Sequence, residues 1–238
     1  MRRGDGTLQF RHGDAITAIY SDEDNGAGQP LQAVAGALGI APFEVSFSAN
    51  EFDPTIGGPL GLRGNSRAQG IDLPFPFPYL GQEYRRIFVS SNGLMDLLGP
   101  NISGANSQMR LLPSLAIAPF WFDLRTDGAI QPNEDVYLAE SSDRITVRWA
   151  AESVPAISGT VAQARPVNFS VTLHRDGRIQ FCYGSGNRDL TGTFGEPGAP
   201  TIGVSRGTEV FGQFVEGYDG ARSIDRARTV TLTPAPGP

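Results

Sequence analysis

Lysine is absent from this sequence, and cysteine is almost absent. The chain has 238 residues and 19 basic residues, all of them arginine. Without a lysine amine, Schiff-base chemistry and the phosphate-binding lysine of Walker-type nucleotide sites are excluded. Cys182 is the single cysteine, which excludes an intrachain disulfide and a thiolate metal cluster. Secreted animal modules of this size often carry disulfides, so the cysteine count favours a prokaryotic source.

Histidine is nearly as scarce, which limits the enzyme classes that the chain can represent. A Ser-His-Asp triad would have to use His12 or His174, and neither lies in a nucleophile or zinc-binding motif. We expect both to be solvated, His174 beside a turn. Carboxylates are numerous, but no spacing singles out a pair for glycosidase chemistry, which stays open as an alternative. The sequence therefore predicts a protein that is not an enzyme.

Long apolar runs and basic clusters are missing too. No stretch is long enough to cross a bilayer, so no membrane span is expected. The arginines are scattered along a chain of net charge −6, so nucleic acid is not an expected partner. No apolar stretch follows the basic residues at positions 2 and 3, and we expect any export signal to lie outside these residues.

Glycine and proline, by contrast, are abundant. The chain has 30 glycines and 18 prolines without a collagen-like period, and hydrophobic residues make up 39% of it. Turn signals separate short apolar segments, and no segment keeps a helical periodicity. This pattern predicts an all-β fold, an antiparallel β-sandwich with about a dozen short strands and little helix.

The same pattern divides the chain into three parts. Residues 1–50 form an N-terminal strand segment that docks on the main domain or on a neighbour. Residues 51–232 form the sandwich. Residues 233–238 are a Pro-rich linker or tail that we do not expect to pair in a sheet.

Turn residues mark two hairpins. A Ser-Asn-Gly turn at residues 91–93 and an Asp-Gly turn at 176–177 each separate two apolar segments, and these residues tolerate the positive φ of tight turns. Residues 71–77 alternate strictly, but their two prolines lack N–H donors. We therefore expect an edge strand there, with its Phe side chains facing the core.

The N-terminal segment contains one clear strand, at residues 15–20, whose alternating apolar side chains need cover. Three partners stay open: the sandwich itself, an upstream domain, or another copy of the chain by strand addition. The third would make the protein a homo-oligomer.

Candidate metal ligands lie just after that strand. Asp22, Asp24 and Asn25 offer oxygen ligands in a glycine-rich loop, as calcium prefers, although their spacing does not match an EF-hand. A solvated turn is the alternative. Asp123 and Asp127 form a weaker second candidate. No other cofactor is expected.

Two further groups are candidate sites. The Phe-Trp-Phe run at residues 120–122 could stack on sugar rings, but alternate strand residues face opposite sides, so at least one of the three must be core. We expect the run to be buried. Cys182 alternates within a strand and is expected to be an inert, buried thiol.

Eight segments carry a resemblance to a known family. They are FPFPY at 75–79, VSSNG at 89–93, IAPFWFDL at 117–124, VY at 136–137, ITVRW at 145–149, NFSVTL at 168–173, DGRIQF at 176–181 and IGV at 202–204. In this order they resemble nidogen-type (NIDO-like) extracellular β domains of secreted or surface bacterial proteins, over roughly residues 70–215. Residues 13–22 resemble the closing strands of bacterial Ig-like repeats.

The resemblance implies a non-catalytic extracellular binding or structural module, with a role in adhesion, scaffolding or assembly. The alternatives are an accessory domain of a secreted hydrolase such as a subtilisin-like protease, or a glycan-binding module. The implied location is extracellular or at the cell surface, and the implied partner is a protein or a glycan there.

Overall fold

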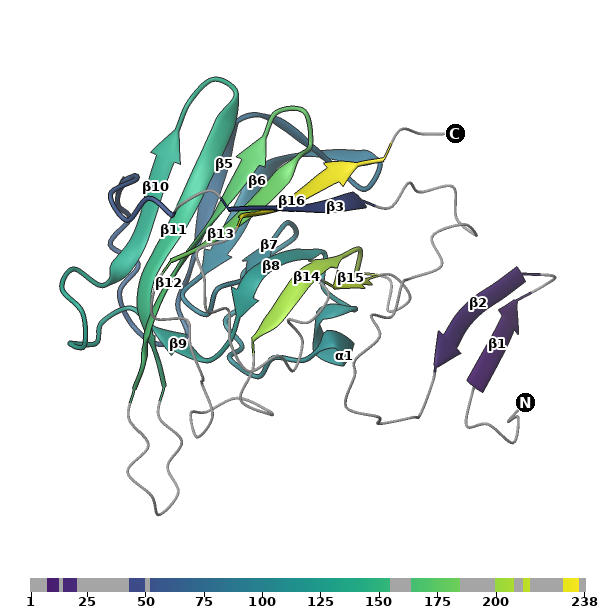
Figure 1. Cartoon of the computed structure of the whole chain (residues 1–238), viewed down its shortest axis with the longest axis horizontal. Coiled ribbons are helices and arrows are strands. Elements are labelled where there is room, and N and C mark those ends of the chain that lie inside the picture. The colour runs from purple at the N-terminus through teal and green to yellow at the C-terminus, as the bar shows by residue number, and fades with distance from the viewer. Residues whose placement is uncertain are drawn as a thin grey trace, which may run out of the picture.

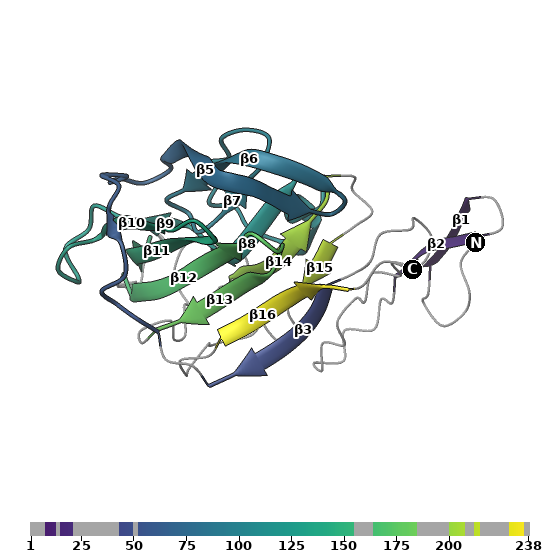
Figure 2. The ribbon, with the colours of Figure 1, turned by 90° about the horizontal axis from the view of Figure 1, so that it is seen from above.

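The computed structural model describes residues 43–49, 52–154, 164–184, 200–207, 212–214 and 229–235, and the backbone of residues 8–12 and 15–20. Within these residues, antiparallel strands form two large sheets that lie face to face (Figures 1 and 2). The helix there is a single turn, α1 (Gln108–Leu111), and no described helix has the length and apolar character to cross a bilayer. The expected all-β sandwich is confirmed.

The larger sheet has eight strands. In spatial order they are β3 (Phe43–Ser48), β16 (Thr229–Pro234), β13 (Ile179–Tyr183), β12 (Pro166–His174), β11 (Arg144–Ser153), β10 (Asp135–Glu140) and β4 (Gly58–Pro59), and β9 (Leu124–Arg125) pairs with one end of β11. Every second side chain of strand β12 points into the core. Its side chains at Val167, Phe169, Val171 and Leu173 are fully buried, as a period of two residues requires.

The smaller sheet has six strands. In spatial order they are β15 (Gly212–Phe214), β14 (Thr201–Ser205), β8 (Ala116–Trp121), β7 (Met95–Asp96), β6 (Gln82–Ser90) and β5 (Ala68–Tyr79). Strand β5 lies at the edge, and its ladder with β6 is interrupted between Asp72 and Phe77, where the prolines stand. The predicted edge strand and its core-facing Phe75 and Phe77 are confirmed.

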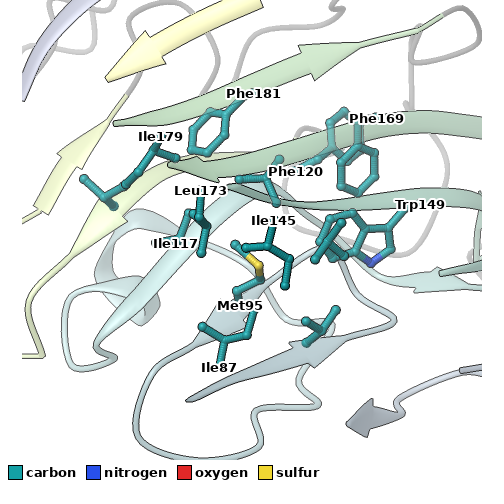
Figure 3. Close-up of a cluster of buried hydrophobic side chains, with 14 of the residues drawn as sticks. Ile87, Met95, Ile117, Phe120, Ile145, Trp149, Phe169, Leu173, Ile179 and Phe181 are labelled. Carbon is teal, nitrogen blue, oxygen red and sulfur yellow. The ribbon is translucent and has the colours of Figure 1, made fainter. Parts of the chain in front are cut away.

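The core between the sheets is rich in aromatic rings (Figure 3). Trp149 stacks on Phe169 with ring centroids 4.8 Å apart, and Phe169 stacks on Phe120 at 5.0 Å. The indole Nε1 of Trp149 donates to the carbonyl oxygen of Ser90 at 2.8 Å, so the buried N–H has a partner. Because Trp149 and Phe169 come from the larger sheet and Phe120 from the smaller, this stack joins the two layers.

Both predicted hairpin turns are present. Gly93 lies between β6 and β7 with φ +71°, and Gly177 lies between β12 and β13 with φ +88°. A β-carbon at Gly93 would stand 2.1 Å from the carbonyl oxygen of Phe120. Glycine is therefore required there for two reasons, the positive φ and the lack of space.

Strand β16 runs further than the sequence predicted. It includes Thr233 and Pro234, which pair with Glu44 and Phe43 of β3, so the expectation that these two residues cannot join a sheet is wrong. A proline is tolerated because it is the last residue of the strand, opposite Phe43, whose carbonyl oxygen accepts from Nε2 of Gln213 and needs no donor from Pro234. The described sandwich thus places its first and last long strands side by side (Figure 2).

The predicted strand at residues 15–20 is present as β2 (Ala15–Tyr20). It pairs with β1 (Leu8–His12) in a separate two-stranded antiparallel sheet. Among the described strands β2 pairs with neither large sheet. Its ladder partner is therefore β1, which is none of the three partners expected from the sequence.

Candidate functional site

A small layer covers the outer face of the smaller sheet. Trp121 of β8 points away from the main core, because its neighbours Phe120 and Phe122 point into it. It forms a second apolar cluster together with residues of β8, the β6–β7 turn and α1, namely Leu94, Leu111, Ala116 and Ala118. All three aromatic side chains are buried, so the predicted burial is confirmed and the run offers no open platform for sugar rings.

Hydrogen bonds fasten the loop between β7 and α1 onto this layer. The indole Nε1 of Trp121 donates to the carbonyl oxygen of Ser103 at 2.7 Å. The amide Nδ2 of Asn92 donates to the carbonyl oxygen of Ile102 at 2.8 Å, while its Oδ1 accepts the backbone N–H of Leu124 at 2.9 Å. Buried side chains therefore hold a surface loop in one conformation.

This loop forms one wall of a groove of about 630 Å³. The lining residues are Asp96, residues 98–103 and residues 113–115. Leu98 and Ile102 line it and are 73% and 49% exposed. Large apolar side chains on an anchored loop, beside a groove, mark a surface suited to contact with another molecule.

Asp96 is the charged residue of the groove. Its Oδ1 accepts the backbone N–H groups of Leu98 at 2.8 Å and Gly99 at 3.3 Å, which fixes the first turn of the loop. Burial raises the pKa of Asp96 above its ordinary value, and the backbone donors oppose this rise. The carboxylate is thus occupied in shaping the groove wall.

A second polar cluster lies near the end of β11, where two buried carboxyl groups meet. Glu152 belongs to β11, and Glu134 directly precedes β10. The backbone N–H of Ile130 donates to Oε2 of Glu152 at 3.2 Å, and the N–H of Gln131 donates to Oε1 of Glu134 at 3.3 Å. The two carboxyl groups therefore hold the loop that leads into β10.

The electrostatics of this pair favour one shared proton. Burial, with the nearby Glu152 carboxylate, raises the pKa of Glu134 from 4.5 to about 7. Oε2 of Glu134 is buried and accepts no hydrogen bond within the described residues, whereas the two carboxyl groups lie within hydrogen-bonding reach of each other. A proton on Glu134 would let it donate to Glu152 and satisfy that oxygen.

The loop backbone packs closely against one member of the pair. A β-carbon at Gly128 would stand 1.9 Å from the carboxyl carbon of Glu152, so the loop backbone covers that group. The nearest positive charge is Arg125, whose Nε is 3.8 Å from Oε1 of Glu152 and 2.8 Å from Oδ1 of Asp127. The arrangement suits a pair of carboxyl groups that holds the loop in place and depends on the protonation of Glu134.

The predicted metal ligands fall in two places. Asp22, Asp24 and Asn25 lie outside the described residues. Asp127 pairs with Arg125, while Asp123 faces Gly104 of the groove loop, and burial raises the pKa of Asp123. Within the described ranges, no three side chains of His, Cys, Asp or Glu gather to hold a metal ion.

Two single residues differ from expectation. His174 is half-buried, with Nε2 2.8 Å from Oε1 of Gln180 across the β12–β13 hairpin, so it is not a freely solvated side chain. Cys182 lies on the outer face of β13 opposite Thr229, so the thiol that we expected to be buried is only half-buried. Burial still raises the pKa of this thiol above its ordinary value.

Comparison with known proteins adds one finding. A family model described as NIDO related matches residues 42–235, which covers both large sheets. Searches among curated proteins and among solved structures gave no match.

Proposed function

The chain belongs to the NIDO-related family, and from this premise we propose that it is a non-catalytic, extracellular binding module that contacts a partner protein through the groove beside Leu98 and Ile102. The proposal rests on one observation, which is that the same loop exposes apolar side chains to solvent and is held in one conformation. Leu98 and Ile102 present apolar surface to solvent, while Trp121 and Asn92 hold the loop in place. Burying exposed apolar area against a partner is favourable, and a preorganised loop loses little entropy on binding.

The chemistry of the groove favours a polypeptide over a sugar. Its open wall carries Leu98, Ile102 and backbone groups, without an exposed aromatic ring. Sugar-binding sites use such rings, and the run at residues 120–122 is buried. The occupant proposed is therefore a protein segment that presents one or two apolar side chains.

The absence of catalysis is part of the proposal and rests on the sites described above. The buried carboxyl pair is covered by the loop at Gly128, and Asp96 is occupied by backbone donors. A role as the accessory domain of a secreted hydrolase is compatible with the same binding surface, since the catalytic unit would then lie elsewhere. The match to the NIDO-related family supports the proposed extracellular location.

A peptide-display selection tests the groove. A library of random peptides is selected against the chain, and affinities of the selected peptides are measured for wild type and for the double variant Leu98→Ser with Ile102→Ser. We expect a loss of about tenfold or more, because two apolar contacts of roughly 1 kcal/mol each are removed. The matched control is Met109→Ser with Ile130→Ser, which removes two similarly exposed apolar side chains outside the groove.

Two results would contradict the proposal. Peptides that bind wild type and the groove variant equally would show that the contact surface lies elsewhere. Turnover of protease, esterase or glycosidase substrates, abolished by Glu134→Gln or Glu152→Gln, would show that the chain is an enzyme.

A further inference from the structure

The four sheet edges of the sandwich are unequally protected against pairing with another strand. Strand β5 carries three prolines, β4 is two residues long and β15 is three residues long. Prolines and short strands are the usual devices that keep an edge from accepting a new strand. Strand β3 has neither, since it is six residues long with the sequence FEVSFS, and it lies on the outside of β16 (Figure 2).

The open side of β3 can be identified from its first residue. The N–H and C=O groups of Phe43 bond to the side chain of Gln213, so they point away from β16. In an antiparallel ladder this direction repeats at every second residue. The N–H and C=O groups of Val45 and Phe47 therefore point outward, and within the described part of the chain no strand pairs with them.

The side chains of β3 leave one apolar group unburied on the same edge. Phe43 and Val45 pack against the core, and Phe47 shares their face of the strand by alternation. Phe47 is nevertheless 52% exposed. A strand added at this edge would cover the Phe47 ring with a side chain on the same face.

We propose that β3 pairs antiparallel with β3 of a second copy of this chain, about a twofold axis through Ser46. In this register Val45 lies opposite the partner's Phe47, and Phe47 lies opposite the partner's Val45, so the outward backbone groups of both residues are paired. Each exposed Phe47 ring then gains an apolar neighbour. The two larger sheets become one continuous sheet across the axis.

The charges of β3 fit this register. Glu44 is the charged residue of the strand, and it lies opposite the partner's Ser48. The two glutamates therefore do not face each other, although like charges placed directly opposite would oppose pairing. Glu44 and Ser48 are both exposed, on the solvent face of the sheet. This surface is distinct from the groove and adds self-association to the proposed binding function.

The first test is the mass of the chain in solution over a concentration series, measured by sedimentation velocity. We expect the mean mass to rise toward that of two chains. Val45→Pro removes an outward N–H and blocks the edge without removing a hydrogen bond to β16, so this variant is expected to stay monomeric. Circular dichroism and denaturant unfolding establish whether it folds.

A charge test at Ser48 keeps the proposal falsifiable if Val45→Pro does not fold. Ser48→Arg would face the partner's Glu44 with opposite charge, and Ser48→Glu would face it with like charge. We expect the dimer dissociation constants of these two variants to differ by about tenfold, because the twofold axis repeats the pair. Adding Glu44→Gln to each should remove the difference. The groove variant Leu98→Ser with Ile102→Ser should dimerise as wild type does, which separates this test from that of the groove.

Three outcomes would overturn the proposal. The chain could remain monomeric at the highest concentration at which it stays soluble. The Ser48→Arg and Ser48→Glu variants could dimerise equally, as pairing through the β1–β2 hairpin would predict. A folded Val45→Pro variant could dimerise as wild type does.

Discussion

The side-chain amide of Gln213 bonds both backbone groups of Phe43. The N–H of Phe43 donates to Oε1 of Gln213 at 3.0 Å, and Nε2 of Gln213 donates to the carbonyl oxygen of Phe43 at 2.7 Å. Gln213 belongs to β15 of the smaller sheet and Phe43 to β3 of the larger, and they are 170 residues apart in sequence. One amide thus replaces a missing strand at the edge of one sheet and ties it to the other.

Replacing Gln213 by glutamate should keep one of the two hydrogen bonds with Phe43 and remove the other. The carboxylate keeps an acceptor for the N–H of Phe43 but loses the donor, and its charge faces a carbonyl oxygen. We expect a loss of about 1–2 kcal/mol in the free energy of unfolding at neutral pH, measured by denaturant titration. Faster hydrogen exchange at the Phe43 amide is not expected, since its acceptor remains. Gln69→Glu, at an exposed position on β5, is the control for the added charge and should change stability little.

The pair of Glu134 and Glu152 should make stability depend on pH. The folded-state pKa of Glu134, about 7, is above its ordinary value of 4.5, so the stabilisation is fully present below about pH 4.5. It is lost as pH rises through the folded-state pKa. We expect the free energy of unfolding to fall by about 2 kcal/mol between about pH 5 and pH 8 from this group, measured as the difference between wild type and Glu134→Gln.

Glu134→Gln supplies the test of that pH dependence. The amide keeps a donor toward Glu152 at every pH, so this variant should lose the decline and be more stable than wild type at about pH 8. Glu140→Gln, on the exposed end of β10, should leave the decline in place. An unchanged pH profile in Glu134→Gln would contradict the shared proton. Arg63, Arg125, Asp127 and Asp135 are the neighbouring charged residues and stay unchanged in both variants.

Gly93→Ala should be among the most damaging single substitutions. The new β-carbon would meet the carbonyl oxygen of Phe120 at 2.1 Å in a backbone conformation with φ +71°. We expect a loss of about 3 kcal/mol or more, measured as the shift in the denaturation midpoint. Gly81→Ala is the matched control, since its φ is +85° but the space beside it is open, and it should cost about 1–2 kcal/mol. Equal losses in the two variants would mean that the contact with Phe120 contributes nothing.

Phe169→Ala should test the aromatic stack that joins the two sheets. Removing this ring leaves a cavity between Trp149 and Phe120, and such truncations cost about 3–5 kcal/mol. Denaturant unfolding followed by tryptophan fluorescence measures the loss directly. Ile130→Ala, at an exposed site, should stay within about 0.5 kcal/mol of wild type.

The parts of the fold that the sequence predicted are those with a local cause. The turns at Gly93 and Gly177 follow from residues that tolerate positive φ, and the edge position of β5 follows from its prolines. Burial of Trp121 follows from its place in an apolar strand. In each case the deciding residues are neighbours in the chain.

The candidate sites depend on contacts between distant residues and were therefore missed. Glu134 and Glu152 look like solvated carboxylates in sequence, and only the loop that folds over them brings them together. Leu98 and Ile102 read as ordinary apolar residues near a Gly-Pro turn. One local signal was present, since Leu97 and Leu98 are consecutive apolar residues before that turn, and alternation sends one of them outward.

The pairing of β3 with β16 also determines how the domain would respond to mechanical force. Phe43 and Pro234 are opposite each other in the ladder, so tension on the flanking chain would pull both from the same end. The backbone hydrogen bonds between β3 and β16 would then break one after another from that end, rather than all at once under shear. The Gln213 amide lies at that end and would resist the first step. In single-molecule pulling through residues 42 and 235, we expect a low rupture force that Gln213→Ala lowers further.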